Sequence, residues 1–259
     1  MSITHLILLK VPVFILGPAI IGGAALFSVL GLLIVRRFVH HSRLKVHHDV
    51  ADPMLGAISA VYAVLIAFIV VAVWQSFDKT NANVQQEANY LADIYRDAEA
   101  FAPDFKEKVG ILLREYREAV VNLEWKAMKE GQMSFEAEKI MNQIWALYIS
   151  YRPKNATEQS FFDESVRKLN SFREMRRQRL MDSRSEITPL LWLVLLSGAV
   201  VTISFTFLFG SENLHAQIVM GVLLSALISL ILFTIIELDF PFAGSVVVSP
   251  EPLNQILLD

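Results

Sequence analysis

The sequence contains no cysteine, which excludes disulfide bonds and thiolate metal sites. It also lacks the H-E-x-x-H and G-x-S-x-G motifs and a phosphate-binding P-loop, and it has no thiol nucleophile. Its basic residues form no block large enough to give a cationic face for nucleic acid. The sequence therefore predicts neither an enzyme nor a nucleic-acid-binding protein, and it predicts no cofactor.

Charge is missing from four long stretches, which are residues 11–35, 53–77, 187–211 and 213–236. None of them contains Lys, Arg, Asp or Glu, and each exceeds the roughly 20 apolar residues that an α-helix needs to cross a bilayer. A core helix of a soluble protein would show a polar face over such a length. We therefore expect an all-α integral membrane protein with four transmembrane helices.

The four spans form two pairs around one charged block, residues 78–186. A tail of residues 1–10 precedes the first span, a short basic loop of residues 36–52 joins the first two, and a tail of residues 237–259 follows the fourth. This order predicts an extramembrane helical domain between the second and third spans.

The spacing of apolar residues predicts four helices in the charged block. The first continues the second span as one helix to about Phe101, and the second covers residues 104–130. Ser134 and Thr157 are the expected N-caps of the third and fourth helices. Thr188 followed by Pro189 is typical of a new helix start, which predicts that the third span begins there.

The distribution of basic residues predicts the orientation. Four of the five that lie outside the charged block sit in the loop 36–52: Arg36, Arg37, Arg43 and Lys45. Because short basic loops stay in the cytoplasm, we expect both termini and the charged block on the outer side, periplasmic or extracellular. Arginines near the third span favour the alternative, a cytoplasmic block.

Small and polar residues form rows within the spans, which suggests two roles. The rows in the third and fourth spans predict helix packing, because small residues let helices approach and hydroxyls bond across the interface. These candidates are Gly198, Thr202, Thr206, Gly221, Ser225 and Ser229. The second span offers a stripe that could line a water-filled pore. Its candidates are Ser59, Tyr62, Ile66, Val70 and Gln75.

Charged residues gather at the predicted membrane borders. Four arginines near the third span are candidates for anion attraction or headgroup contact, with pairing to neighbouring carboxylates as the alternative. They are Arg173, Arg176, Arg177 and Arg179. Glu237 and Asp239 leave the fourth span together and are candidates for Ca²⁺, with a simple membrane-edge turn as the alternative.

A set of short motifs resembles the bacterial bestrophin-like domain family over about residues 45 to 252. The motifs that carry the resemblance include Tyr62–Ala63–Val64–Leu65, Glu87–Ala88–Asn89, Tyr116, Glu124–Trp125, Arg176, Arg179–Leu180, Pro189–Leu190–Leu191–Trp192 and Leu238–Asp239–Phe240–Pro241–Phe242–Ala243–Gly244. The resemblance implies a bacterial inner-membrane protein and a distant likeness to bestrophins, which are pentameric anion channels. It carries no channel residue over to this chain.

Two functions follow from these observations. The first is a homo-oligomeric, passive ion-channel-like protein whose second span lines the symmetry axis, with membrane lipid and an inorganic ion as its partners. The spans contain no charged residue, so they offer no parts for a proton relay or a charge-driven pump. The alternative is a non-conducting membrane scaffold or sensor whose extramembrane domain binds a partner.

Overall fold

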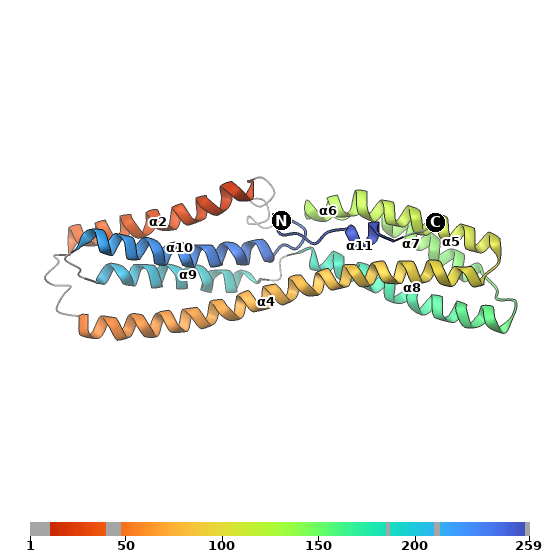
Figure 1. Ribbon diagram of the computed structural model, residues 1–259, viewed down its shortest axis with the longest axis horizontal. Helices are drawn as coiled ribbons and strands as arrows, with labels where there is room; N and C mark the ends of the chain where they lie inside the picture. The colour runs from red at the N-terminus through yellow and green to blue at the C-terminus, as the bar shows by residue number, and fades with distance from the viewer. Residues whose placement is uncertain (1–10, 40–47, 185–186, 210–212, 257–259) are drawn as a thin grey trace. The chain divides into compact units, whose positions relative to one another are not determined.

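The computed structural model describes residues 11–39, 48–184, 187–209 and 213–256, with the backbone alone at residues 48–52 (Figure 1). The described residues form helices and turns and contain no strand. Residues 40–47 of the predicted basic loop, which include Arg43 and Lys45, lie outside them. The all-α fold class is confirmed.

Among the described residues, four helices are long and apolar enough to cross a membrane, as predicted. They are α2 (Val13–Phe38), the first part of α4 (His48–Asp97), α9 (Pro189–Phe205) with the short 3₁₀ helix η3 (Thr206–Leu208), and α10 (Leu214–Leu238). The third span starts with Thr188 as N-cap and Pro189 at the first helical position, which confirms that prediction. Asn213 caps α10 by accepting a hydrogen bond from the amide of Ala216.

The chain divides into two compact units, and the membrane unit comprises the described residues up to Gln75 and those from Ile187 to Asp239. Within it, α2 packs along α10 (Figure 1). Their contact depends on Gly221, because a Cβ there would lie 2.7 Å from Ser28 Oγ. Gln217 ties the start of α10 to its neighbours: it accepts from Arg36 Nη2 at 2.7 Å and donates to the carbonyl of Phe209 at 2.6 Å.

The second unit, which we call the helical unit, comprises residues 76–184 and 240–256 of the described chain. It contains the second part of α4, η1 (Ala98–Ala100), α5 (Pro103–Ala119), the π-helical turn η2 (Val120–Glu124), α6 (Trp125–Lys129), α7 (Glu136–Ser150), α8 (Ala156–Asp182) and α11 (Glu251–Asn254). Its core is apolar and closely packed, and its fully buried members include Leu91, Leu113, Ile144, Leu169 and Phe172.

The predicted helices of the charged block are present, with two corrections at their starts. The helix that begins in the second span continues to Asp97, and the expected helix over residues 104–130 is α5, η2 and α6 in succession. Asn155, not Thr157, is the N-cap of α8, because its side chain accepts from the amide of Glu158 at 2.9 Å. Phe135, not Ser134, occupies the N-cap position of α7.

The segment after α10 is built into the helical unit, although the sequence predicted only a tail there. Phe242 packs edge-to-face on Trp125, with ring centroids 5.4 Å apart. The Trp125 indole donates to the carbonyl of Val248 at 3.3 Å, and Leu253 is fully buried in the core. Residues 240–256 therefore help to hold the helical unit together.

Candidate functional site

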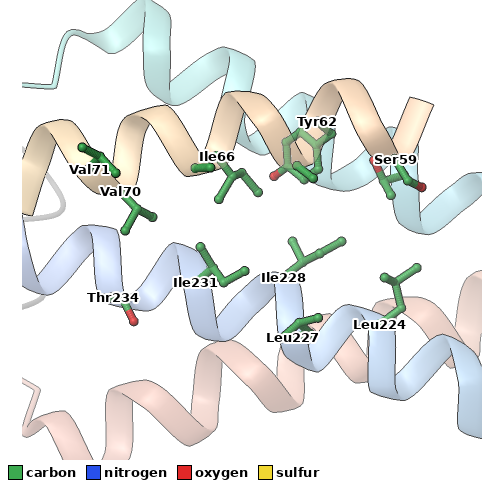
Figure 2. Close-up of a pocket in the computed structure, with 13 residues that line it drawn as sticks. Ser59, Tyr62, Ile66, Val70, Val71, Leu224, Leu227, Ile228, Ile231 and Thr234 are labelled. Atoms are coloured by element: carbon green, nitrogen blue, oxygen red, sulfur yellow. The ribbon is translucent and has the colours of Figure 1, made fainter. Parts of the chain in front are cut away.

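One hollow of the membrane unit is a groove between α4, α9 and α10, with a volume of 550 Å³ (Figure 2). Side chains of α4 and α10 face one another across it, among them Ile66 on one side and Ile228 and Ile231 on the other. We call it the α4–α10 groove. Its walls are almost wholly apolar, and its polar side chains are the hydroxyl-bearing Ser59, Tyr62, Thr202 and Thr234.

Tyr62 forms one wall of this groove and fixes α4 against α9. Its hydroxyl donates to the carbonyl of Leu195 at 2.8 Å, and its ring lies on Gly198. A Cβ at Gly198 would lie 2.4 Å from Tyr62 Cε2, so only glycine permits this approach. Tyr62 also lines a second groove, of 530 Å³, between α4 and α9. Tyr62 therefore contributes to two apolar grooves.

The five candidate pore residues do not share one helix face. Ser59, Tyr62, Ile66 and Val70 line the α4–α10 groove, and Tyr62 and Ile66 are buried there. Gln75 is exposed and is not among the groove residues. At 100° per residue, Gln75 lies about 180° around the helix from Ile66. One face of α4 therefore carries four of the five candidate pore residues.

Two of the candidate packing residues lie at contacts between helices of the chain. Gly198 receives Tyr62, and Gly221 approaches Ser28. Three hydroxyls turn back to their own helices: Thr206 donates to Ile203, Ser225 to Val222 and Ser229 to Ser225. Thr202 differs, because its Oγ1 is buried and has no hydrogen-bond partner among the described residues.

The helical unit contains a buried ionic network. Arg179 binds Glu87 through two hydrogen bonds, Nε to Oε2 at 2.7 Å and Nη2 to Oε1 at 3.1 Å, and its Nη2 also reaches Glu124 Oε1 at 2.7 Å. Arg176 binds the second oxygen of Glu124 at 2.7 Å, and Tyr116 donates to Glu87 Oε1 at 2.8 Å. Each residue comes from a different helix or turn except the two arginines, so the network joins α4, α5, η2 and α8.

Burial and charge together set the protonation of this network. Burial alone would lower the pKa of the Arg179 guanidinium, but the carboxylates of Glu87 and Glu124 outweigh it and raise that pKa. Burial raises the pKa of the Tyr116 hydroxyl well above its usual range, and the nearby Glu87 raises it further. Two buried arginines face two buried carboxylates, so the charges balance and a buried ion cluster is tolerated.

The four candidate arginines lie in two environments. Arg176 and Arg179 are buried in the network, and Arg176 also pairs with Glu138. Arg173 and Arg177 are exposed, at 3.5 Å from Glu138 and 2.6 Å from Glu174, respectively. Anion attraction and headgroup contact stay predictions for this set. The predicted pairing with carboxylates nearby in the sequence holds for Arg177, which pairs with Glu174. It does not hold for Arg179, because the carboxylates that Arg179 binds are distant in the sequence.

Glu237 and Asp239, the candidate metal ligands, are both buried at the end of α10. Asp239 Oδ1 accepts a hydrogen bond from the amide of Ile187 at 3.1 Å, which joins the end of α10 to the start of the third span. Within the described ranges, no group of three or more His, Asp or Glu side chains gathers as metal ligands would.

The family assignment comes from comparison with known proteins. The family model of the Bestrophin-like domain matches residues 22–253, so the chain belongs to this family, as the motifs predicted. The match extends further towards the N-terminus than the resemblance did. No curated protein and no solved structure matches the chain significantly. Together with the four apolar helices, the family indicates a membrane protein.

Five residues of the motifs that carry the family resemblance lie together in the structure. Glu87, Tyr116, Glu124, Arg176 and Arg179 all belong to those motifs, and the structure joins them in one network. Their sequence spacing gave no sign of this, because the pairs are separated by 29 to 92 positions. The π-helical turn η2 supplies Glu124, and π-turns are frequent where a helix places a functional or specialised side chain.

Proposed function

We propose that this protein is a homo-oligomeric membrane protein of the bacterial inner membrane that conducts ions passively, with the second span lining the axis. The family supports a channel-like function. The observation that carries the proposal is the α4–α10 groove, because it collects Ser59, Tyr62, Ile66 and Val70 on one face of α4. The absence of charged residues from the spans supports passive conduction over pumping.

Oligomerisation is supported by the small residues that α4 leaves exposed. They form a row of Gly56, Ala60, Ala63 and Ala67. Because small residues permit close helix contact in lipid, this row suits an interface between copies around a symmetry axis.

We also propose that the helical unit lies outside the bilayer, on the outer side. Its surface carries exposed ion pairs, such as Arg177 with Glu174, which suit water and not hydrocarbon. The basic loop 36–52 supports the outer placement, because short basic loops stay in the cytoplasm. Gln132 is a suitable reporter position for this placement, since it is exposed and lies between α6 and α7.

Labelling of a Gln132→Cys variant in intact cells therefore tests the orientation. The native chain has no cysteine, so a membrane-impermeant maleimide reports this position alone. Labelling of intact cells supports an outer helical unit. Labelling that appears only after the cells are permeabilised supports the cytoplasmic alternative.

Recordings from planar bilayers containing the purified protein test conduction. We expect ohmic or gated currents, and no conductance across pH, Ca²⁺ concentration and voltage would contradict the proposal. Ile66→Ser places a hydroxyl in the apolar path and should raise conductance, since apolar constrictions limit wetting. Val64→Ser is the matched control, because Val64 is an exposed residue on the same helix and does not line the groove. Equal effects of the two changes on conductance would show that this face of α4 does not line the conduction path.

A second candidate function is a membrane scaffold or sensor, and exposed apolar side chains on the helical unit favour it. Two adjoining hollows, of 480 and 530 Å³, lie between α5 and α7, with Gln143 in both. Leu123, at their edge, is 51% exposed, and Phe135, just before α7, is 79% exposed. The 480 Å³ hollow is lined mainly by apolar side chains and the 530 Å³ hollow mostly by charged and polar ones, and exposed apolar side chains beside such hollows are typical of interaction surfaces. This function is favoured if the wild-type protein conducts no ions and if a protein that co-purifies with the wild type is lost from the Leu123→Glu variant.

A further inference from the structure

The described chain passes between the helical unit and the membrane unit at three places. α4 crosses after Gln75 without a break in its helix. α9 follows α8 a few residues after Asp182, and residues 240–256 follow α10. The helices α4, α9 and α10 are also the three that line the α4–α10 groove. Each helix of the groove is therefore joined through the chain to the helical unit.

Inside the helical unit, residues close to all three crossings pack in one small apolar cluster, which we call the junction core. Its members are Phe77 and Val84 of α4, Trp125 and Met128 of α6, Leu180 of α8, and Phe242 and Val248 of the segment after α10. Val84 and Met128 are almost fully buried, and Phe242 and Val248 are buried beside them. The segments that continue as α4, α9 and α10 are thus held at one place within the helical unit.

Trp125 contacts the segment after α10 and α8 together. Its indole donates to the carbonyl of Val248 at 3.3 Å, and its ring meets Phe242 edge-to-face with the centroids 5.4 Å apart. The guanidinium of Arg179, on α8, lies 4.8 Å from the centre of the Trp125 ring. Because Arg179 also binds Glu87 of α4, one continuous set of contacts joins all three crossing segments.

A further hydrogen bond joins α4 to the end of α8 directly. The amide of Asn83 donates to Asp182 Oδ2 at 3.1 Å, and Asp182 is the last residue of α8. Buried side chains are packed at close to crystal density, so a displacement of one of them displaces its neighbours. A shift of α6 inside the helical unit therefore moves the segments that lead into the spans.

We propose that the junction core couples the helical unit to the α4–α10 groove. In this device residues 240–248 are a strap that fixes the chain at the end of α10 to α6, and Trp125 holds the strap to α8 and, through Arg179, to α4. A ligand or partner that displaces α6 changes the spacing of α4 and α10, because coupling between sites travels through packed side chains and rigid helices.

This coupling goes beyond the proposed function and does not depend on it. A chain that conducts nothing and still changes the spacing of α4 and α10 when the junction core is altered contradicts the channel and supports the coupling. Ion currents with a spacing that ignores the junction core support the channel and contradict the coupling.

Distances between spin labels on α4 and α10 test the coupling in the full chain. The double variant Val64→Cys with Leu230→Cys places one label on each helix, and the native chain has no cysteine to label. Both positions are exposed, and neither lines the α4–α10 groove, so the labels leave the groove as it is. Double electron–electron resonance is recorded in nanodiscs, with the labelled chain diluted by cysteine-free chain so that distances within one copy dominate.

Phe242→Ala removes the ring that the strap places in the junction core. We expect the distance between the two labels to shift by about 1–2 Å, the size of common helix shifts, and its distribution to broaden. Phe105→Ala is the matched control, because it removes the same ring from the same unit. Phe105 is buried in the main core, against Tyr148 and Tyr151, and is not a member of the junction core.

Trp125→Phe is the milder variant, and it decides the test if Phe242→Ala fails to fold. It keeps an aromatic ring and removes the hydrogen bond to Val248, so we expect a smaller change of the same kind. An altered distance in the junction-core variants with an unaltered distance in Phe105→Ala supports the coupling. A wild-type distance in both junction-core variants, or an equal change in Phe105→Ala, overturns it.

Discussion

Arg179 of α8 and Glu87 of α4 form a two-point ion pair, 2.7 Å from Nε to Oε2, with both side chains fully buried. Ninety-two positions separate them in the sequence. The pair is completed by Glu124 and Tyr116, and the Arg179 guanidinium also lies 4.8 Å from the centre of the Trp125 ring. The planar guanidinium of Arg179 therefore joins α8 to α4 and η2 through its hydrogen bonds to Glu87 and Glu124.

Arg179→Met should destabilise the helical unit strongly. The change leaves buried Glu87 with the Tyr116 hydroxyl and buried Glu124 with Arg176, and breaking a buried ion pair on one side costs about 3–5 kcal/mol. Thermal unfolding of the full chain in detergent, followed by tryptophan fluorescence, should show a midpoint lower by on the order of 10 °C. Arg177→Met is the control on the same helix, where an exposed pair contributes about 0–1 kcal/mol. Equal midpoints for the two variants would contradict the structural role of the network.

Arg179→Lys tests the geometry separately from the charge. Lysine keeps the positive charge but cannot present the planar fork that reaches Glu87 and Glu124 together. We expect a midpoint between those of the wild type and Arg179→Met. Full stability of the lysine variant would show that charge balance alone holds the unit.

The sequence predicted the spans and most helix boundaries because each depends on local pattern. Charge-free runs located the four apolar helices, and Thr188–Pro189 located a helix start. The cap of α8 was predicted at Thr157 because both Asn155 and Thr157 are good cap residues, and only the contact with the Glu158 amide decides between them.

The parts that depend on distant contacts were not predictable. Nothing in the sequence around Arg179 indicates that its partners are Glu87 and Glu124, because a salt bridge has no sequence period. Likewise, residues 240–256 contain little regular structure, so no periodicity shows that Phe242 and Leu253 are buried. The α4–α10 groove depends on three helices whose relative rotation becomes known only from the fold.

Gly198→Ala should loosen the contact between α4 and α9. The added methyl would lie 2.4 Å from the Tyr62 ring, so the ring must move and its hydrogen bond to Leu195 is strained or lost. Overpacking of this kind costs about 1–3 kcal/mol. Gly22→Ala is the control, because a Cβ at Gly22 meets nothing within 4 Å and alanine is the better helix former. Thermal midpoints in detergent should fall for Gly198→Ala and stay level or rise for Gly22→Ala.

The stability of the helical unit should fall at alkaline pH. Burial raises the pKa of the Tyr148 hydroxyl to about 12, while an unfolded chain has a tyrosine pKa of about 10. Between these values the unfolded chain loses the proton and the folded chain keeps it. This contribution is therefore fully present below about pH 10 and is lost as the pH rises towards 12, at about 1.4 kcal/mol per pH unit.

Denaturant unfolding at about pH 9, 10, 11 and 11.5 measures that slope. Tyr116, whose pKa is also raised by burial, adds a second contribution of the same sign. Tyr148→Phe removes one titrating group and should make the fall in stability shallower by about one proton. An unchanged slope in Tyr148→Phe would show that Tyr148 ionises equally in both states.

Leu253→Ala should destabilise the helical unit although the residue lies only a few positions from the end of the sequence. Leu253 is fully buried in the core with Leu113 and Leu169, and a buried Leu→Ala change typically costs about 2–5 kcal/mol. Val247→Ala is the control from the same segment, because Val247 is 44% exposed and its truncation leaves no cavity. Thermal unfolding of both variants decides whether residues 240–256 are structural. If Leu253→Ala unfolds at the same temperature as the wild type, residues 240–256 are a peripheral tail, as the sequence alone suggested.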